Sequence, residues 1–478
     1  MAKHNEDTRV KLPAILHLVR LGYTYLSLKD TTWDEDTNIF PELFKSAMLR
    51  VNPELEEDAV HRLFQDVSLS LENEDLGHAF YDMLMEKSGT RLIDWDDFDN
   101  NTFHVVTELT YKNGDEAFRP DIILLINGMP LAFIEVKKPN NPEGVLAERK
   151  RINQRFANKR FRKFVNLTQL MMFSNNMEYD ELTASPVQGA FYGTPSYSEV
   201  KFNFFREEEN LDLETLLLPE DEAVEDFLLA DTNYPAVKNS PEFLTNKNPN
   251  TPTNRLSTSL FSRERLAFLL QYAITYVKGK RLEKHIMRYP QIFATKAIES
   301  KLDEGMKKGI IWHTQGSGKT ALAYYNVKHL TDYYQKQNII PKFYFIVDRL
   351  DLLDQAKKEF LARGLTVHTV SSKSDFIKEI KKQSSITNKS GKAEITVVNI
   401  HKFSADSQVI TQNDYSTDLQ RIYFLDEVHR SYNPKGSFLA NLTESDRSAI
   451  TIGLTGTPLL GNDYNSKMLF GDYIHKYY

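Results

Sequence analysis

Residues 309–320 read GIIWHTQGSGKT, and this stretch decides the fold of the second half of the chain. A short apolar run ends at His313, a glycine-rich turn follows, and the helix-like sequence ALAYYNVKHL comes directly after the turn. A tight turn between a strand and a helix directs backbone N–H groups at a phosphate, and the helix N-terminus adds a favourable dipole. Gly316 and Gly318 give the turn the backbone freedom that it needs. The stretch therefore predicts a phosphate-binding loop.

The side chains of this loop suggest a magnesium nucleotide as the ligand. We expect Lys319 to reach the β- and γ-phosphates and the Thr320 hydroxyl to ligate Mg²⁺. The strict pattern GxxxxGK[ST] has glycine where this chain has His313, so the match is to the shorter form TxGxGKT, which begins at Thr314 and includes Ser317. The alternative is a Gly/Ser surface loop that happens to precede Lys-Thr. The order strand, loop, helix favours the nucleotide site.

A pair of carboxylates follows in the stretch 421–431, RIYFLDEVHRS. The apolar run 422–425 predicts a buried parallel strand, and its C-terminal end presents Asp426 and Glu427, where open α/β sheets bind ligands. We expect Asp426 to hold Mg²⁺ and Glu427 to polarise the attacking water. Asp-Glu at a strand end is common and is usually a solvated cap. Its combination with a phosphate loop favours the catalytic interpretation.

Short β-rich runs alternate with helical patterns throughout this half, which predicts a parallel sheet with crossover helices. The runs are GIIWH at 309–313, KFYFIVD at 342–348, EITVVNI at 394–400, RIYFLDE at 421–427 and AITIGLTG at 449–456.

The first half carries a different motif at 119–139, RPDIILLINGMPLAFIEVKKP. Two apolar runs flank an Asn-Gly pair, a strong indication of a tight β-hairpin. Asp121 begins the first strand, and Glu135 and Lys137 are two residues apart on the second, so they share a face. Two carboxylates on one face can hold Mg²⁺, and a neighbouring lysine can orient or help deprotonate a metal-bound water and stabilise charge on a scissile phosphate. The alternative is a hairpin whose charged end faces water.

A basic segment follows this hairpin directly. Residues 148–163, ERKRINQRFANKRFRK, contain eight basic side chains and one acidic side chain, whereas 30–99 and 206–231 are strongly acidic. We expect the arginines and lysines to neutralise phosphates of DNA and the phenylalanines Phe156, Phe161 and Phe164 to form the buried stripe of a helix. Stacking of these rings on bases is the alternative. The acidic segments are read as solvated surface.

Composition sets the broad class. The chain has 478 residues with 41% hydrophobic and 26% charged side chains, a formal net charge of −7 and no cysteine. These values exclude a low-complexity chain, a globally basic coat, a disulfide scaffold and a thiolate metal site. The N-terminus shows no secretory signal and no run is long enough to span a membrane, so we expect a cytoplasmic protein without a membrane partner.

The stretch around 234–253 is rich in Pro and Asn and has no apolar period, as is typical of a surface linker. We therefore expect an α/β domain at 1–240 with a mostly helical beginning, a linker at 241–254, and a second α/β domain at 255–478.

The second domain resembles superfamily 2 helicases and translocases. Asp426-Glu427-Val428-His429 is similar to their DEAD/DEAH box, 455–458 to motif III, 345–355 to motif Ia, and 396–403 to the next DNA-contacting segment. The resemblance implies a RecA-like lobe that binds ATP and Mg²⁺, with His429 in the nucleotide site. Gln291, in the segment RYPQ, is the candidate for adenine recognition, although a plain surface glutamine would read the same way.

The first domain resembles PD-(D/E)xK nucleases, with Pro120-Asp121 and Glu135-Val136-Lys137 as the signature. The resemblance implies a mixed sheet flanked by helices. Related nucleases often carry QxxxY after this strand; Gln154 fits the first position, but Asn158 stands at the last. Glu42 is a candidate for the additional upstream carboxylate of some such nucleases.

A nuclease followed by this motor resembles the restriction (R) subunit of type I restriction–modification enzymes. IEVKKPNN, HTQGSGKT, LDEVHRSY and LTGTPLLGND occur in that family's order. The resemblance implies ATP-driven translocation of double-stranded DNA coupled to cleavage. It also implies a specificity subunit and a modification subunit as partners, the latter using S-adenosylmethionine.

Two other functions stay open at this point. One is a repair-type or type III-like helicase–nuclease, and the other is a DNA-binding assembly module whose hairpin carboxylates are structural. The chain ends about 20 residues after Thr457, and a superfamily 2 motor needs two RecA-like lobes. We therefore expect an N-terminal fragment that binds nucleotide and does not translocate.

Overall fold

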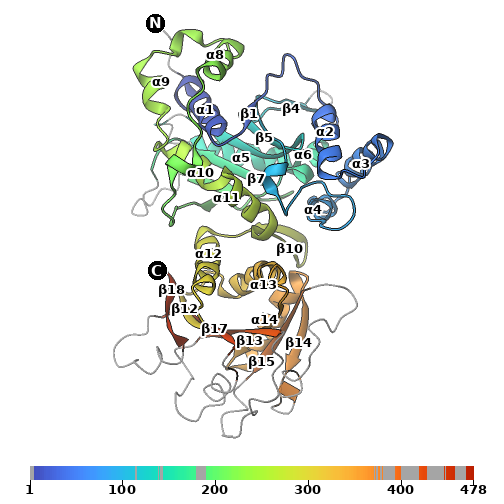
Figure 1. The fold of residues 1–478 in the computed structure, drawn as a ribbon, viewed down its shortest axis with the longest axis vertical. Coiled ribbons are helices and arrows are strands. Elements are labelled where there is room, and N and C mark those ends of the chain that lie inside the picture. Colours follow the sequence, from blue (N-terminus) through green and yellow to red (C-terminus); the bar gives the residue numbers. More distant parts are fainter. Residues whose placement is uncertain are drawn as a thin grey trace. The chain divides into compact units, whose positions relative to one another are not determined.

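The computed structural model describes residues 5–113, 116–137, 139, 144–178, 190–370, 372, 375–376, 379, 393–399, 419–427, 446, 448–457 and 470–478. The chain divides into two compact units. Unit 1 comprises Met1–Tyr276 with Leu282–Tyr289, and unit 2 comprises Val277–Arg281 with Pro290–Tyr478. Figure 1 shows the elements of each unit.

Unit 1 is built on a mixed seven-stranded sheet of order β1-β2-β5-β6-β7-β8-β9, in which β1 with β2 and β6 with β7 are the parallel pairs. β3 and β4 form a separate two-stranded sheet, as do β10 and β11. The strands are β1 (Thr24–Tyr25), β2 (Phe103–Thr107), β3 (Tyr111–Asn113), β4 (Glu116–Phe118), β5 (Ile122–Ile126), β6 (Met129–Val136), β7 (Leu170–Ser174), β8 (Ala190–Gly193), β9 (Asn203–Phe204), β10 (Ile274–Lys278) and β11 (Leu282–Ile286).

Helices and short helical turns surround this sheet. The α-helices are α1 (Leu12–Arg20), α2 (Pro41–Val51), α3 (Glu57–Ser70), α4 (His78–Leu84), α5 (Gly144–Ala157), α6 (Arg162–Leu167), α7 (Leu213–Leu216), α8 (Glu222–Asp231), α9 (Pro241–Asn246), α10 (Pro252–Phe261) and α11 (Arg263–Phe268). The short turns are the π-helical η1 (Asp7–Lys11) and η5 (Leu269–Ala273) and the 3₁₀-helical η2 (Phe98–Asn100), η3 (Lys159–Phe161) and η4 (Pro235–Val237). The helical beginning expected from the sequence is confirmed by α1 to α4.

The phenylalanines of the basic segment lie in the core, as expected. Phe156, Phe161 and Phe164 are all buried, and Phe164 packs against Phe133 of β6 at a ring-centroid distance of 5.6 Å. Because these rings are covered, they do not form a stacking platform for bases. Their burial fixes α5 and α6 against the sheet face that β6 presents.

The predicted hairpin is present as β5 and β6, which pair antiparallel. Asn127 and Gly128 connect them with φ values of 51° and 77°, so both residues have the left-handed backbone that an Asn-Gly turn adopts. The Asn127 side chain is fully buried and accepts a hydrogen bond from the Thr102 N–H at 2.8 Å. All residues of both strands are buried. The turn is therefore anchored inside unit 1.

The stretch 241–254 does not form the surface linker that we expected. It contains α9 and the start of α10, and Thr253 is buried with its hydroxyl 2.8 Å from the Ser174 hydroxyl of β7. Pro241 and Pro252, two of the prolines that suggested a linker, occupy the first turns of these two helices, where a missing N–H costs nothing. The division between the compact units lies later in the chain, at 277–290.

Unit 2 contains a seven-stranded sheet whose described pairings are all parallel, in the order β14-β15-β13-β16-β17-β12-β18. The expected parallel sheet is thus confirmed. Helices α13 and α14 pack against the sheet and against each other (Figure 1). The elements are α12 (Tyr289–Asp303), β12 (Lys308–His313), α13 (Lys319–Gln335), β13 (Ile340–Val347), α14 (Leu350–Ala362), β14 (Thr366–Val370), β15 (Glu394–Asn399), β16 (Leu419–Asp426), β17 (Ile450–Thr455) and β18 (Asp472–Tyr477).

A matched pair of glycines tests how tightly the hairpin turn is held. Gly128 and Gly89 have φ values of 77° and 76°, but a Cβ at Gly128 would lie 2.7 Å from the Phe44 nitrogen, whereas a Cβ at Gly89 would meet nothing within 4 Å. We expect Gly89→Ala to cost about 1 kcal/mol from backbone strain alone. We expect Gly128→Ala to cost at least about 3 kcal/mol, because a clash with backbone is added to the strain. Urea unfolding followed by tryptophan fluorescence measures both; equal costs would contradict the prediction.

Candidate functional site

The hairpin brings the three candidate nuclease residues of the sequence together. Asp121 stands directly before β5, Glu135 is the penultimate residue of β6, and Lys137 follows that strand. The Val136 N–H donates a 3.0 Å hydrogen bond to Asp121 Oδ2. Lys137 Nζ lies 3.7 Å from Asp121 Oδ2 and 3.8 Å from Glu135 Oε2. The antiparallel return thus places both carboxylates beside one ammonium group.

Two further carboxylates approach the same lysine. Lys137 Nζ lies 3.5 Å from Glu6 Oε1 and 3.8 Å from Glu148 Oε2. We call Lys137 with Glu6, Asp121, Glu135 and Glu148 the Lys137 cluster. Sequence reasoning missed Glu6 and Glu148. Glu148 could have been noticed in the sequence, because it is the one acidic residue in the basic segment 148–163.

The cluster changes the protonation of its members. Glu135 is only 5% exposed, and burial raises its pKa well above the usual range, with the charges of Asp121 and Glu148 adding to the effect. Burial acts to lower the pKa of Lys137, but the surrounding carboxylates outweigh it and raise that pKa. Lys137 is therefore held as an ammonium ion, which can donate hydrogen bonds and balance negative charge but cannot accept a proton.

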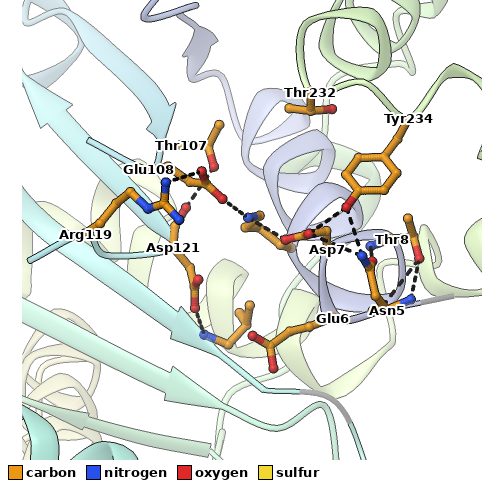
Figure 2. Close-up of polar contacts among 12 residues, drawn as sticks. Asn5, Glu6, Asp7, Thr8, Thr107, Glu108, Arg119, Asp121, Thr232 and Tyr234 are labelled. Carbon is orange, nitrogen blue, oxygen red and sulfur yellow. Dashed lines mark hydrogen bonds and ion pairs between the residues drawn. The ribbon is translucent and has the colours of Figure 1, made fainter. Parts of the chain in front are cut away.

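A network of hydrogen bonds and ion pairs holds the backbone at Asp121 in place (Figure 2). The Thr107 hydroxyl and the Glu108 N–H both donate to the Asp121 carbonyl oxygen, at 2.9 and 3.3 Å. Glu108 has a φ of 59°, a conformation that non-glycine residues rarely adopt. Its carboxylate accepts from Lys11 at 2.7 Å and pairs with Arg119 at 3.2 Å. Lys11 and Arg119 thus hold the turn at Glu108, whose N–H contacts the Asp121 carbonyl oxygen.

The same network connects the beginning of the chain to the cluster (Figure 2). Asp7 pairs with Lys11 at 2.5 Å and accepts a hydrogen bond from the Tyr234 hydroxyl at 2.9 Å. Asn5 donates to the same hydroxyl at 2.9 Å. With both neighbours fixed, Glu6 is directed toward Lys137.

The donor set suits a hard divalent cation such as Mg²⁺. Asp121 and Glu135 offer carboxylate oxygens from the adjacent arms of the hairpin, and the pKa of Glu135 is raised by burial and by the nearby carboxylates, which Lys137 only partly balances. Within the described ranges, no group of three or more His, Cys, Asp or Glu side chains is already arranged around a metal position. Asp121 and Glu135 are thus the residues that would hold the ion.

Two weaker sequence candidates lie elsewhere. Glu42 is exposed on α2, and no described contact joins it to the Lys137 cluster. Gln154 is exposed on α5, where it lines an open groove with Arg149, Lys150, Asn153 and Ala157. Among the described residues, the upstream carboxylate that approaches Lys137 is that of Glu6 and not that of Glu42, because the polar network brings Glu6 to the site.

In unit 2 the glycine-rich turn has the expected geometry. It connects β12 to α13, Gly316 and Gly318 have φ values of 81° and 83°, and Lys319 is the first residue of the helix. Lys319 Nζ donates to the His313 carbonyl oxygen at 3.4 Å. A Cβ placed on Gly456 would lie 3.3 Å from the same Lys319 Nζ. The loop and the segment after β17 therefore meet at the lysine.

The carboxylate pair lies at the same end of the sheet. Asp426 is the last residue of β16 and lies opposite Leu454 of β17. The next residue of β17, Thr455, lies opposite Trp312 of β12, close to the start of the loop. Burial raises the pKa of Asp426 to about 6, the charge of Glu427 adds to this, and Lys319 opposes it. Glu427 has a φ of 53°, a strained backbone of the kind that concentrates at functional sites.

Other loop residues are fixed by backbone contacts. The Thr314 N–H donates to the Tyr477 carbonyl oxygen at 3.0 Å, and the Ser317 N–H donates to the Thr314 carbonyl oxygen at 3.2 Å. Thr320 is the second residue of α13 and is partly exposed. Gln291 is buried, and its Nε2 donates to the Gly318 carbonyl oxygen at 3.1 Å, so it contacts the loop itself. His429 lies outside the described residues.

The departure from the strict loop pattern has a structural reason. His313 is fully buried, and its Nε2 lies 2.8 Å from Nδ1 of His475 in β18. A glycine at this position could not make that contact. No pattern in the sequence indicated that β18 pairs with β12. Nor did one indicate that the Tyr477 carbonyl oxygen of β18 accepts a hydrogen bond from the Thr314 N–H.

Comparisons with known proteins agree with this division of the chain. Residues 3–184 match the family described as type I restriction enzyme R protein N terminus, and residues 290–478 match SWI2/SNF2 ATPase. A putative type I restriction enzyme endonuclease subunit, MjaIXP of Methanocaldococcus jannaschii, is 27% identical over 513 residues, which cover 100% of this chain and 44% of that protein. The HindI endonuclease subunit of Haemophilus influenzae is 23% identical, covering 92% of this chain and 40% of that protein.

Among solved structures, the Sulfolobus solfataricus SWI2/SNF2 ATPase core in complex with double-stranded DNA is 15% identical, with a TM-score of 0.26, and covers 42% of this chain and 37% of that chain. The Type ISP restriction-modification enzyme LlaBIII bound to DNA is 12% identical, with a TM-score of 0.28, and covers 41% of this chain and 16% of that chain.

No helix among the described residues has the length and apolar character that a membrane crossing requires.

The chain spans less than half the length of the curated relatives described above. The two family matches nevertheless occur in the same order as the two units and together cover most of the chain. The chain is thus similar over its whole length to type I restriction enzyme endonuclease subunits, with its first part matching the R protein N terminus family and its second part the SWI2/SNF2 ATPase family.

Proposed function

We propose that this chain supplies the nuclease and the first part of the ATP-driven motor of a type I restriction enzyme, a site-specific deoxyribonuclease. The observation that carries the proposal is the convergence of Asp121, Glu135 and Lys137 at one end of a buried hairpin. In the whole enzyme, ATP hydrolysis would move double-stranded DNA and lead to its cleavage. Modification and specificity subunits, the former using S-adenosylmethionine, would complete the complex in the cytoplasm.

In the nuclease site, Asp121 and Glu135 would hold Mg²⁺. The bound ion supplies Lewis-acid stabilisation of the scissile phosphate and an activated water. Lys137 is charged, so its role is to donate hydrogen bonds to the phosphate and to balance the charge that develops on it. The groove on α5, with Arg149 and Lys150, is suited to the DNA backbone because its cations can neutralise phosphates.

In the nucleotide site, Lys319 and the N–H groups of the loop would bind the phosphates of ATP. Thr320 and Asp426 would hold Mg²⁺, and Glu427 would orient the attacking water. Gln291, whose side chain donates to the Gly318 carbonyl oxygen, would support the loop and recognise the adenine base. A Cβ on Gly456 would lie 3.3 Å from Lys319 Nζ, so the segment after β17 passes close to the residue that would bind the phosphates.

Removing the charges of the nuclease site should separate cleavage from ATP use. In the full-length subunit assembled with its partners, we expect Glu135→Gln and Lys137→Met each to lower the rate of cleavage of unmodified DNA by at least about 100-fold, because both act on transition-state charge. DNA-stimulated ATPase activity should be unchanged. Glu42→Gln, which changes an exposed carboxylate of the same unit, is the control. Cleavage at the normal rate by Glu135→Gln would refute the nuclease assignment.

Loss of the loop lysine should abolish nucleotide binding. Lys319→Ala should weaken the affinity for a fluorescent ATP analogue by about 100-fold, because a charge-assisted contact to the phosphates is lost. Lys328→Ala, further along α13, is the matched control and should bind normally. Equal affinity of the two variants would show that the nucleotide binds elsewhere.

The raised pKa of Asp426 predicts a pH dependence. Because the carboxylate must be ionised to hold Mg²⁺ and its pKa is about 6, protons compete with the ion increasingly as pH falls through 6. We expect the magnesium-dependent nucleotide affinity of the wild type to fall about 10-fold from pH 7 to pH 5 relative to Asp426→Asn. The ratio of the two affinities, measured at each pH, removes contributions from other titrating groups. A constant ratio would contradict this role.

A further inference from the structure

Helix α5 presents a buried stripe that begins with a carboxylate. Ile152 and Phe156 are 0% and 1% exposed and lie in the hydrophobic core, and Glu148, one helical turn before Ile152, is 2% exposed. An apolar residue at this position would continue the stripe. A buried carboxylate is unfavourable unless it is paired with positive charge, so its partners indicate what it does.

The partners of Glu148 belong to two different groups. Its Oε2 lies 3.8 Å from Lys137 Nζ and 3.2 Å from Arg151 Nη2, and its Oε1 lies 3.6 Å from Arg155 Nη1. The Lys137 side chain is 14% exposed, whereas those of Arg155 and Arg151 are 29% and 54% exposed. Glu148 therefore stands between the inner lysine and two arginines that reach toward the surface.

Neighbouring ion pairs of the same helix differ from this arrangement. Arg149 pairs at 2.8 Å with Glu199, whose side chain is 71% exposed, and this pair has no described link to the Lys137 cluster. Arg155 also lies over the Phe118 ring at 4.3 Å, which limits the directions that its guanidinium can take. Arg151 and Arg155 thus share a carboxylate with Lys137, whereas Arg149 pairs with a carboxylate outside the Lys137 cluster.

We propose that Glu148 is a positioning residue of the nuclease site, which holds the Lys137 ammonium and couples it to Arg151 and Arg155 so that a DNA backbone bound by these arginines is aligned with the catalytic lysine. This inference rests on the proposed nuclease function. When phosphates of DNA pair with the two arginines, Glu148 loses part of their positive charge and Lys137 becomes its main partner. DNA binding and the placement of Lys137 are therefore linked.

The test uses the full-length subunit in the assembled enzyme, with cleavage of unmodified DNA measured at a series of Mg²⁺ concentrations. We expect Glu148→Gln to lower the cleavage rate at saturating Mg²⁺ by about 10- to 100-fold, since an ammonium group that is no longer fixed stabilises the transition state less well. The Mg²⁺ concentration for half-maximal rate and the DNA-stimulated ATPase activity should change by less than about 3-fold. Glu148→Asp should recover part of the rate, and Glu199→Gln, the control that removes the exposed carboxylate paired with Arg149 of α5, should cleave normally.

Coupling to the arginines is tested by a double-variant cycle. Arg155→Met should lower the cleavage rate on its own, but combined with Glu148→Gln it should lower it little further, because both changes break the same connection. Fully multiplicative effects would show that Arg155 and Glu148 act independently and would overturn the coupling.

Other outcomes also overturn the inference. A normal rate for Glu148→Gln would show a structural role only, and if that variant melts at a lower temperature, Glu148→Met, which suits the apolar stripe, takes its place. A large rise in the Mg²⁺ requirement with a normal rate at saturation would make Glu148 a metal ligand. If Glu135→Gln also cleaves normally, the proposed nuclease function itself fails; if Glu135→Gln is inactive and Glu148→Gln is normal, only this inference fails.

Discussion

The candidate site of unit 1 depends on one electrostatic constraint, the gathering of four carboxylates, two of them buried, around a single ammonium group. Lys137 lies between 3.5 and 3.8 Å from each of them, and none of these contacts is a short hydrogen bond. At such separations in a partly buried site, each charge pair interacts more strongly than it would in water. The negative neighbours of Lys137 raise its pKa, and burial, with the negative charges of Asp121 and Glu148 adding to it, raises the pKa of Glu135. A divalent cation would relieve this imbalance.

Holding like charges together requires elements that cannot move apart. The hairpin does this with two fully buried strands and a turn whose Asn127 side chain is bonded inside unit 1. Glu108 accepts an uncommon backbone conformation because Lys11 and Arg119 bind its carboxylate, and that turn then fixes the Asp121 carbonyl. Strain at Glu108 is thus compensated by two ion pairs a few ångströms away.

Local patterns in the sequence predicted the parts of the site that depend on local geometry. The two-residue period placed Glu135 and Lys137 on one face, the Asn-Gly pair gave the turn, and the order of strand, glycine-rich turn and helix located Lys319. Glu6 and Glu148 could not be found in this way, because they reach Lys137 through the packing of separate elements. The linker expectation failed for a related reason: proline marks helix starts as well as loops, and only the contact of Thr253 with Ser174 distinguishes the two.

The two units use the same physical device at their candidate sites. In each, a carboxylate at the end of a buried strand has a raised pKa, a second carboxylate raises it further, and one lysine opposes the effect. In unit 1, Asp121 raises the pKa of Glu135 and Lys137 opposes that effect. In unit 2, Glu427 raises the pKa of Asp426 and Lys319 opposes it. Such a pair favours a proton in the absence of other cations, and a divalent ion with a phosphate competes with that proton more effectively than either would alone. Metal and phosphate should therefore bind together at both sites, which ties the chemistry of each site to the arrival of its anionic substrate.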